Sequence, residues 1–417
     1  MRQFFKKLLF FQFLWAALAV SLHASSISSS DLTLKSADLI KKSEEVIASH
    51  PKDGNAYAAL AAALVGLGRY QEGIEKCQKA VQLNANLPAA YGAWAYSLAK
   101  LGQYQQADIM FQKCLSIFPK YKSGFFLWGS ILSEQGRYEE AVPRFKVAIN
   151  LEPTFIKAYQ ALGRALALED KIDDSIDVYI KAVELEPNNM ETYMDWGNVL
   201  CQTGRNELGI KKFKEVIKLN SDNVEAYVNW GMALYRTGKT DDAVRKIQEA
   251  LEVNPKAVSP YKLWMTILLD QKDYDGALEK SKQILALDPH NLDAIDAWAN
   301  ILCAQGLYRD CIAKCQEAIA VNPEDAEAYD NWGCAIDNSG NSEAAIHKFQ
   351  SAASYNFQDI FVYRNWGNAL MKQGRYKEAL EKYMKIFQLK PDTHIPGNRF
   401  LIDEIKQRIE DAKSKLK

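Results

Sequence analysis

The sequence predicts an all-α solenoid of ten contiguous 34-residue helix-turn-helix repeats with a capping helix at each end. Three regularities predict it: a glycine that returns every 34 residues, bulky aromatic residues ahead of it, and small residues on both sides of it. A column here means a position within the 34-residue unit, counted from Gly54. The units run without insertion over 54–87, 88–121, 122–155, 156–189, 190–223, 224–257, 258–291, 292–325, 326–359 and 360–393.

Column 15 marks the turn between the two helices of each unit. Asp170 and Lys272 occupy it in units four and seven, and glycine occupies it elsewhere. Glycine reaches left-handed backbone conformations without steric cost, so its recurrence indicates where each first helix ends. The glycines are Gly68, Gly102, Gly136, Gly204, Gly238, Gly306, Gly340 and Gly374.

Two bulky columns and two small columns predict how the helices of a unit pack. Column 4 is aromatic in all units but one, and column 7 holds most of the tryptophans; their spacing of three places them on one helical face. Column 8 is glycine or alanine except at Met265, and column 20 is small in every unit. Glycine inside a helix costs roughly 1 kcal/mol relative to alanine, so its recurrence predicts that no room exists for a Cβ. We expect the repeat tryptophans to pack in the core: Trp94, Trp128, Trp196, Trp230, Trp264, Trp298, Trp332 and Trp366.

These columns resemble the tetratricopeptide repeat (TPR) family over residues 54–393. Tryptophan in column 7 departs from the leucine that is more usual there. The resemblance implies a right-handed superhelix whose first helices line a concave, ligand-binding surface.

The chain ends lie outside the repeats. Three basic residues precede an apolar run over 8–22, and residues 1–24 therefore have the layout of a secretory signal cleaved after Ala24. An uncleaved membrane anchor formed by 8–22 is the alternative, although the run is short for a bilayer span. We expect an exported protein, periplasmic or secreted. Residues 25–53 are predicted to form a spacer and an N-terminal capping helix, and 394–417 a C-terminal capping helix whose apolar stripe is Ile402, Ile405, Ile409, Ala412 and Leu416.

Composition and spacing favour no enzyme, cofactor or metal. Basic and acidic residues number 51 and 52, and no basic stripe indicates a nucleic-acid partner. The five histidines have no nucleophile and orienting acid at a recognisable spacing. Cys311 and Cys315 lie one helical turn apart, but further metal ligands at suitable spacing are missing. Cys303 and Cys334, in adjacent units, are candidates for a disulfide.

Columns 2, 5, 6, 9, 12 and 13 face the ligand, if the resemblance to the TPR family holds. Asparagines in columns 6 and 9 are similar to the asparagine ladder of O-GlcNAc transferase TPRs, which binds a peptide backbone through amide donors and acceptors. Carboxylates in units five to nine are expected to attract basic segments in a salt-dependent manner. The predicted site comprises Glu191, Asp195, Asn198, Glu225, Asn229, Asp293, Asp296, Asn300, Glu327, Asp330, Asn331, Asp337, Asn365 and Asn368.

We therefore expect a non-enzymatic scaffold that binds extended or helical segments of other proteins, with basic character, in an exported assembly or secretion complex. Two alternatives stay open. An accessory subunit of a glycosyltransferase or polysaccharide-export system would bind sugars along its tyrosine and tryptophan faces, and a secreted effector would bind host proteins.

Overall fold

A computed structural model describes residues 29–389 and 396–416 of the chain. The predicted signal over 1–24 lies outside these residues. Within them the chain is all-helical, with helices α2 to α23 and no strand. The prediction of an all-α helical-repeat fold is confirmed.

Each 34-residue unit contains two helices. The first helices are α3 (Gly54–Gly66), α5 (Pro88–Lys100), α7 (Lys122–Glu134), α9 (Ile156–Leu168), α11 (Met190–Gln202), α13 (Val224–Arg236), α15 (Val258–Asp270), α17 (Leu292–Ala304), α19 (Ala326–Asn338) and α21 (Ile360–Lys372). The second helices are α4 (Tyr70–Leu83), α6 (Tyr104–Ile117), α8 (Tyr138–Leu151), α10 (Ile172–Leu185), α12 (Asn206–Leu219), α14 (Thr240–Val253), α16 (Tyr274–Leu287), α18 (Tyr308–Val321), α20 (Ser342–Tyr355) and α22 (Tyr376–Gln388). The capping helices are α2 (Ser29–Ser49) and α23 (Pro396–Lys415).

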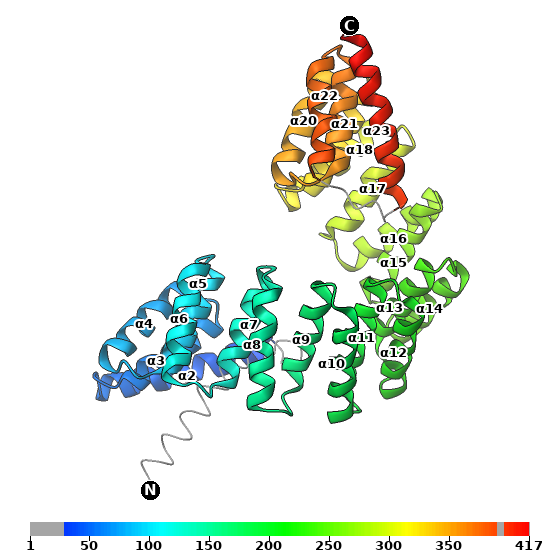
Figure 1. Cartoon of the computed structure of the whole chain (residues 1–417). Helices are drawn as coiled ribbons and strands as arrows, with labels where there is room; N and C mark the ends of the chain where they lie inside the picture. Colours follow the sequence, from blue (N-terminus) through cyan, green and yellow to red (C-terminus); the bar gives the residue numbers. More distant parts are fainter. Residues whose placement is uncertain (1–28, 390–395, 417) are drawn as a thin grey trace. The chain divides into compact units, whose positions relative to one another are not determined.

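The chain divides into two compact units, one ending at Lys212 and the other beginning at Phe213. Inside each of them, helices that are neighbours in sequence pack against each other, as α3 does with α4 and α19 with α20 (Figure 1). First helices of successive repeats also pack against each other, as α17 does with α19 and α19 with α21. Successive first helices therefore present the same columns side by side.

The turn column adopts a left-handed backbone in every unit. Its glycines have φ between 71° and 96°, and Asp170 and Lys272 adopt the same conformation at 62° and 60°. The residue after this position donates its N–H to a carbonyl five residues earlier, as Lys239 does to Leu234 at 3.0 Å. This bond closes the C-terminal turn of the first helix in the manner of a Schellman motif.

The glycines of column 8 leave space for the aromatic rings of column 24. A Cβ added at Gly129, Gly163, Gly333 or Gly367 would lie within 2.7 Å of the ring that faces it. Those rings belong to Phe145, Tyr179, Phe349 and Tyr383, which are almost fully buried. The expectation that no room exists for a Cβ is therefore correct at these four glycines.

Two exceptions in column 8 have smaller partners in column 24. Ala299 belongs to the same unit as Cys315, and both side chains lie in one buried cluster. Met265, the bulkiest member of column 8, shares its unit with Ser281, whose hydroxyl donates to the Ala294 carbonyl at 2.7 Å. Repeat two differs, because Ala95 and the fully buried ring of Phe111 lie in one cluster.

The tryptophans of column 7 are only partly core residues. Trp128 and Trp196 are buried and the other six are half-buried, four of them packed against core clusters, so the expected core packing is complete at two positions and partial elsewhere. A cation from column 23 of the same unit covers the ring in seven units, at 3.3–4.3 Å from its centroid. Such contacts are worth about 0.5–2 kcal/mol each and shield the exposed ring face. The pairs are Trp128–Arg144, Trp196–Lys212, Trp230–Lys246, Trp264–Lys280, Trp298–Lys314, Trp332–Lys348 and Trp366–Lys382.

The two end helices cover the outermost repeats. In α2, Ser43 is buried and lies 34 residues before Cys77, in the register of a second helix. In α23 the buried stripe is Leu401, Ile405, Ile409 and Ala412. The predicted stripe is therefore wrong at Ile402 and at Leu416, which is 52% exposed. In the part of the chain that the structure describes, no helix is long and apolar enough to cross a membrane.

Cys303 forms a disulfide with Cys311, at a Cα–Cα distance of 5.4 Å, and joins the two helices of repeat eight. The expected pairing with Cys334 is wrong. Column 12 does not face a ligand in these units, because it packs against column 20 of the second helix; a Cβ at Gly73, for example, would lie 2.6 Å from Val65. In repeat eight the residue of column 20 is Cys311 and the residue of column 12 is Cys303, so the contact between these two columns brings the cysteines close enough to form the disulfide.

Gly333→Ala should destabilise the protein by about 1–2 kcal/mol, because the new Cβ collides with Phe349 and outweighs the gain in helix propensity. Chemical denaturation measures the change. The matched control is Ala299→Gly, which removes a Cβ from the same column and should cost roughly 1 kcal/mol through propensity. Adding Phe349→Leu to Gly333→Ala should recover part of the loss. A Gly333→Ala variant that is more stable than the wild type would contradict the packing argument.

Candidate functional site

In each of the two compact units, columns 2, 5, 6 and 9 of successive first helices form what we call the first-helix face. Glu191, Asp195 and Asn198 lie on it on α11, in the first unit, and the other predicted site residues lie on it in the second unit, except Asp337, which stands in column 12. Several of these carboxylates pair with a base from a neighbouring repeat. Asp195 accepts from Arg164 at 2.5 Å and Asp293 from Lys262 at 2.5 Å. Asp337, in column 12, pairs with Lys372 at 2.7 Å. These contacts tie consecutive repeats together and neutralise part of the acidic character that the sequence predicts.

The asparagines of the face differ in their hydrogen bonding. Asn365 donates to the Asp330 carboxylate at 2.9 Å and 3.2 Å, and Asn368 accepts from the Tyr383 hydroxyl at 2.7 Å. Asn331 keeps a buried Nδ2 without a partner, whereas Asn300 is exposed. Asn198 and Asn229 are half-buried. The amides therefore do not form a uniform ladder, and their role in peptide binding stays a prediction.

Two further carboxylates of the face, Glu191 and Glu225, are exposed. The Ser259 hydroxyl donates to Glu225 at 2.7 Å. Both side chains remain accessible to a partner, because neither is enclosed by its neighbours.

The highest local density of acid lies on α17 and α19, and we call it the acidic patch: Asp293, Asp296, Asp325, Glu327 and Asp330. Asp296 is 5% exposed and Asp325 is 8% exposed. Asp325 caps α19 by accepting from the backbone N–H groups of Glu327 and Ala328, at 3.1 Å and 3.2 Å. This cap explains why an acid is retained at a buried position, since the helix N-terminus stabilises its negative charge.

Burial and neighbouring acids raise the pKa values of Asp296, Glu327 and Asp330 in the patch. Burial raises the pKa of Asp330 to about 7, with further increases from Asp359 and Glu327, while Asn365 and Arg364 oppose the shift. Burial also raises the pKa of Asp296, and Asp325 and Glu327 add to it. On α11, burial raises the pKa of Asp195 to about 6 against the opposing charge of Arg164. Such groups gain most from a cation that approaches them.

The patch fits a positively charged organic group better than a metal ion. Among the described residues, no group of three or more histidines, cysteines or carboxylates is placed to hold a metal. Carboxylates buried in a protein wall instead form strong, directional hydrogen bonds with ammonium and guanidinium groups.

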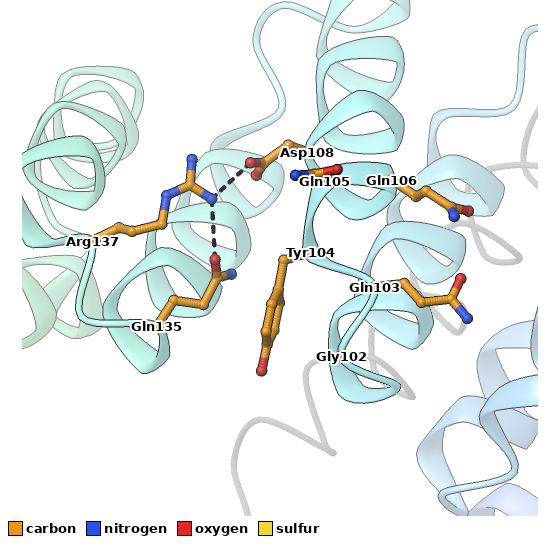
Figure 2. A pocket seen from close by; sticks show the side chains of 8 residues that line it. All are labelled: Gly102, Gln103, Tyr104, Gln105, Gln106, Asp108, Gln135 and Arg137. Carbon is orange, nitrogen blue, oxygen red and sulfur yellow. Dashed lines mark hydrogen bonds and ion pairs between the residues drawn. The ribbon is translucent and has the colours of Figure 1, made fainter.

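Apart from the acidic patch, a hollow of about 550 Å³ lies between the turns of repeats two and three (Figure 2). Arg137 points to Asp108 at 2.8 Å and Gln135 at 3.1 Å, and it also pairs with Glu140. Gln103 and Gln106 point away from the arginine (Figure 2). Asp108 and Glu140 already neutralise Arg137, and glutamine side chains make up most of the remaining lining. The hollow is therefore a weaker candidate site than the first-helix face.

Sequence reasoning missed two features of these surfaces. Asp325 stands in column 34, outside the columns assigned to the ligand, yet it lies against Asp296. The cations over the tryptophans were also missed, although lysine recurs in column 23 at Lys246, Lys280, Lys314, Lys348 and Lys382. A column-by-column search for charge would have found the second feature, but not the first.

The geometry defines a class of protein: a helical-repeat solenoid with a polar face formed by successive first helices. Sequence models described as TPR repeat or tetratricopeptide repeat match residues 43–88, 88–121, 156–189, 197–238, 224–257, 268–331 and 360–393. Together the matches cover more than half of the chain. The chain belongs to the TPR family, and it is a protein-interaction scaffold.

Among solved structures, that of yeast Tom70 supports the same fold. Yeast Tom70 is 14% identical, with a TM-score of 0.52, and the alignment covers 97% of this chain and 96% of Tom70. YrrB, described as a TPR protein with an unusual peptide-binding site, is 19% identical over 45% of this chain and 96% of its own, at a TM-score of 0.36. Pseudomonas aeruginosa pilF is 17% identical over 50% and 96%, at 0.41. The comparison with curated proteins found no match.

Asp330→Asn should remove part of the pH dependence of stability. The folded pKa of about 7 lies above the ordinary value of 3.8, so the folded state holds the proton more tightly than the unfolded state. The resulting stabilisation is complete below about pH 4 and is lost as the pH rises through 7. Relative to the wild type, the variant should therefore gain on the order of 2 kcal/mol between pH 5 and pH 8. Denaturation curves across this range measure it, and a constant difference would contradict the assignment.

Proposed function

We propose that this protein is a non-enzymatic scaffold that captures a cationic segment of another protein on the first-helix face of repeats six to nine. The observation that carries the proposal is the acidic patch, where Asp293, Asp325 and Glu327 lie around the buried Asp296 and, among the described residues, Lys262 is the one base that pairs with them. A positively charged segment would supply the missing charge and would be drawn to the face by long-range attraction.

The repeat geometry favours an extended or helical peptide as the ligand. Equivalent columns recur along adjacent first helices, so the face presents carboxylates and amides in a row and not in a single pocket. The partnerless Nδ2 of Asn331 adds a donor that a peptide carbonyl would satisfy. A row of this kind binds several side chains and main-chain groups of one segment.

No catalytic role is proposed for this face. Its described residues offer carboxylates and amides, and acyl or phosphoryl transfer would need a nucleophile beside a base or a bound cofactor. Its chemistry therefore suits recognition.

We also propose that the protein is exported and works in an oxidising compartment, within an assembly or secretion complex. The layout of residues 1–24 supports export. The Cys303–Cys311 disulfide supports it independently, because disulfides persist outside the reducing cytosol.

A role as the accessory subunit of a sugar-transferring or polysaccharide-exporting system gains no support from the tryptophans. Sugars stack on free aromatic faces, whereas lysine or arginine covers the column 7 rings in seven repeats. We therefore make no second proposal for this face.

A fluorescent peptide of alternating lysine and alanine should bind the protein, and its Kd should rise several-fold between about 50 and 200 mM salt. Glu327→Lys should weaken binding by about tenfold, because it reverses an exposed charge of the acidic patch. Fluorescence anisotropy measures both effects. The matched control, Glu381→Lys, makes the same charge change on the second helix α22 and should leave Kd within about twofold. Salt-independent binding, or equal loss in both variants, would rule out the proposed face.

Thiol counting tests the compartment. Protein purified without reductant and alkylated after denaturation should show five modified cysteines, since Cys303 and Cys311 form the disulfide and the other five are thiols. Reduction before alkylation should raise the count to all seven. Mass spectrometry gives both numbers. Seven modified cysteines in protein taken directly from its native compartment would argue for a reducing location.

A further inference from the structure

We propose that Asp296 is the anchor of the first-helix face: a lysine or arginine side chain of the bound segment donates to Asp296 Oδ1 and displaces the proton that the buried Asp296 carboxyl holds in the free protein. This inference rests on the proposed function and names the chemistry of its central contact. It also predicts that partner binding releases a proton.

The state of Asp296 is the first argument. The residue lies on α17 and is 5% exposed, yet its Oδ1 has no hydrogen-bond partner. A buried polar atom without a partner costs about 1–3 kcal/mol, and more when it is charged. Leucine or alanine would avoid that cost, as Leu263 and Ala297 do on the same face at 4% and 7% exposure. A carboxylate that is buried but unsatisfied is therefore poised for a donor that the chain itself does not supply.

The groups around Asp296 explain why a proton occupies the site before the partner arrives. Asp293 from α17, Asp325 from the residue before α19, and Glu327 from α19 all add negative charge. Like charges this close cannot all ionise in a poorly solvated site, so one carboxyl retains a proton. Burial raises the pKa of Asp296 and the Asp325 carboxyl raises it further, in part through a shared hydrogen bond.

Neighbouring residues supply no alternative counterion for Asp296. Lys262 of α15 is engaged by Asp293 at 2.5 Å. Cys315 of α18 faces the same carboxylates, and burial together with Asp296 raises its pKa to about 12, so it stays a neutral thiol. Arg364 of α21 hydrogen-bonds to Asn365 at 3.1 Å and acts on Asp330.

The exchange is balanced in atoms and charge. In the free protein the proton lies on the Asp296 carboxyl; in the complex an ammonium or guanidinium N–H donates to Oδ1 and Asp325 keeps its bonds to the α19 backbone. The O–H bond breaks and the proton passes to the buffer. Because Asp296 is then ionised next to a cation, the contact is a charge-assisted hydrogen bond, about twice as strong as a neutral one. Affinity should therefore rise with pH near neutrality.

Isothermal titration calorimetry with the alternating lysine–alanine peptide tests the inference. Titrations at pH 7 in two buffers of different ionisation enthalpy give the number of protons released. The wild-type protein should release about half to one proton per peptide. Asp296→Asn should abolish the release and weaken binding by about tenfold or more. The matched control, Glu327→Gln, removes an exposed charge of the same patch and should weaken binding while proton release persists.

The outcomes separate this inference from the proposed function. Peptide binding by the wild type without proton release overturns the anchor but leaves the scaffold proposal standing. Absence of any peptide binding overturns both. Titration with Mg²⁺ or Ca²⁺ alone should give no heat; saturable binding that Asp296→Asn removes would make the patch a metal site and would overturn the anchor. The wild-type proton count keeps the test decisive even if Asp296→Asn fails to fold, which circular dichroism would show.

Discussion

This structure depends on one contact, the packing of an aromatic ring of the second helix of a repeat against a glycine of the first helix of the same repeat. Phe349 and Tyr383 fill space that a single methyl group at Gly333 or Gly367 would occupy. This close approach lets the two helices of a 34-residue unit bury part of a hydrophobic core, although one unit alone is too small to bury a complete core. Neighbouring units then bury what remains, so stability accumulates along the array.

This packing also determines where polar chemistry can appear. Because the second helix and the small columns pack in the core, polar groups occur in columns 2, 5, 6 and 9 of the first helices, which lie beside the same columns of the next repeat within a compact unit. Some of these residues link repeats, as Asp195 does with Arg164, and others, such as Asp296, are left without a partner. One face therefore serves both cohesion and recognition. A carboxylate of this face links two repeats where the adjoining repeat supplies a lysine or arginine to pair with it. Where no such base is supplied, the carboxylate is available for recognition of a partner.

Much of the fold followed from residue types and spacing, while the site followed only in outline. The turn column was identified correctly, including at Asp170 and Lys272, because the left-handed φ is a local backbone property. The column of tryptophans was placed too deep, since periodicity reports which face of a helix a residue occupies and not whether a lysine covers the ring. The Cys303 pairing was wrong for a related reason: the choice between Cys311 and Cys334 depends on which Cα atom lies within about 7 Å of that of Cys303, and spacing along the chain does not resolve this.

The sequence by itself determined the repeat length, the helix pairs and the row of carboxylates and amides along the first helices, because each of these depends on periodicity within one short unit. Only the tertiary structure decided which of those polar groups are already bonded. It showed Asp293 and Asp337 beside lysines, Asn365 bound to Asp330, and Asp296 buried against Asp325 with a free oxygen. Burial and charge pairing arise between residues of different helices, so they exist only once the repeats have stacked.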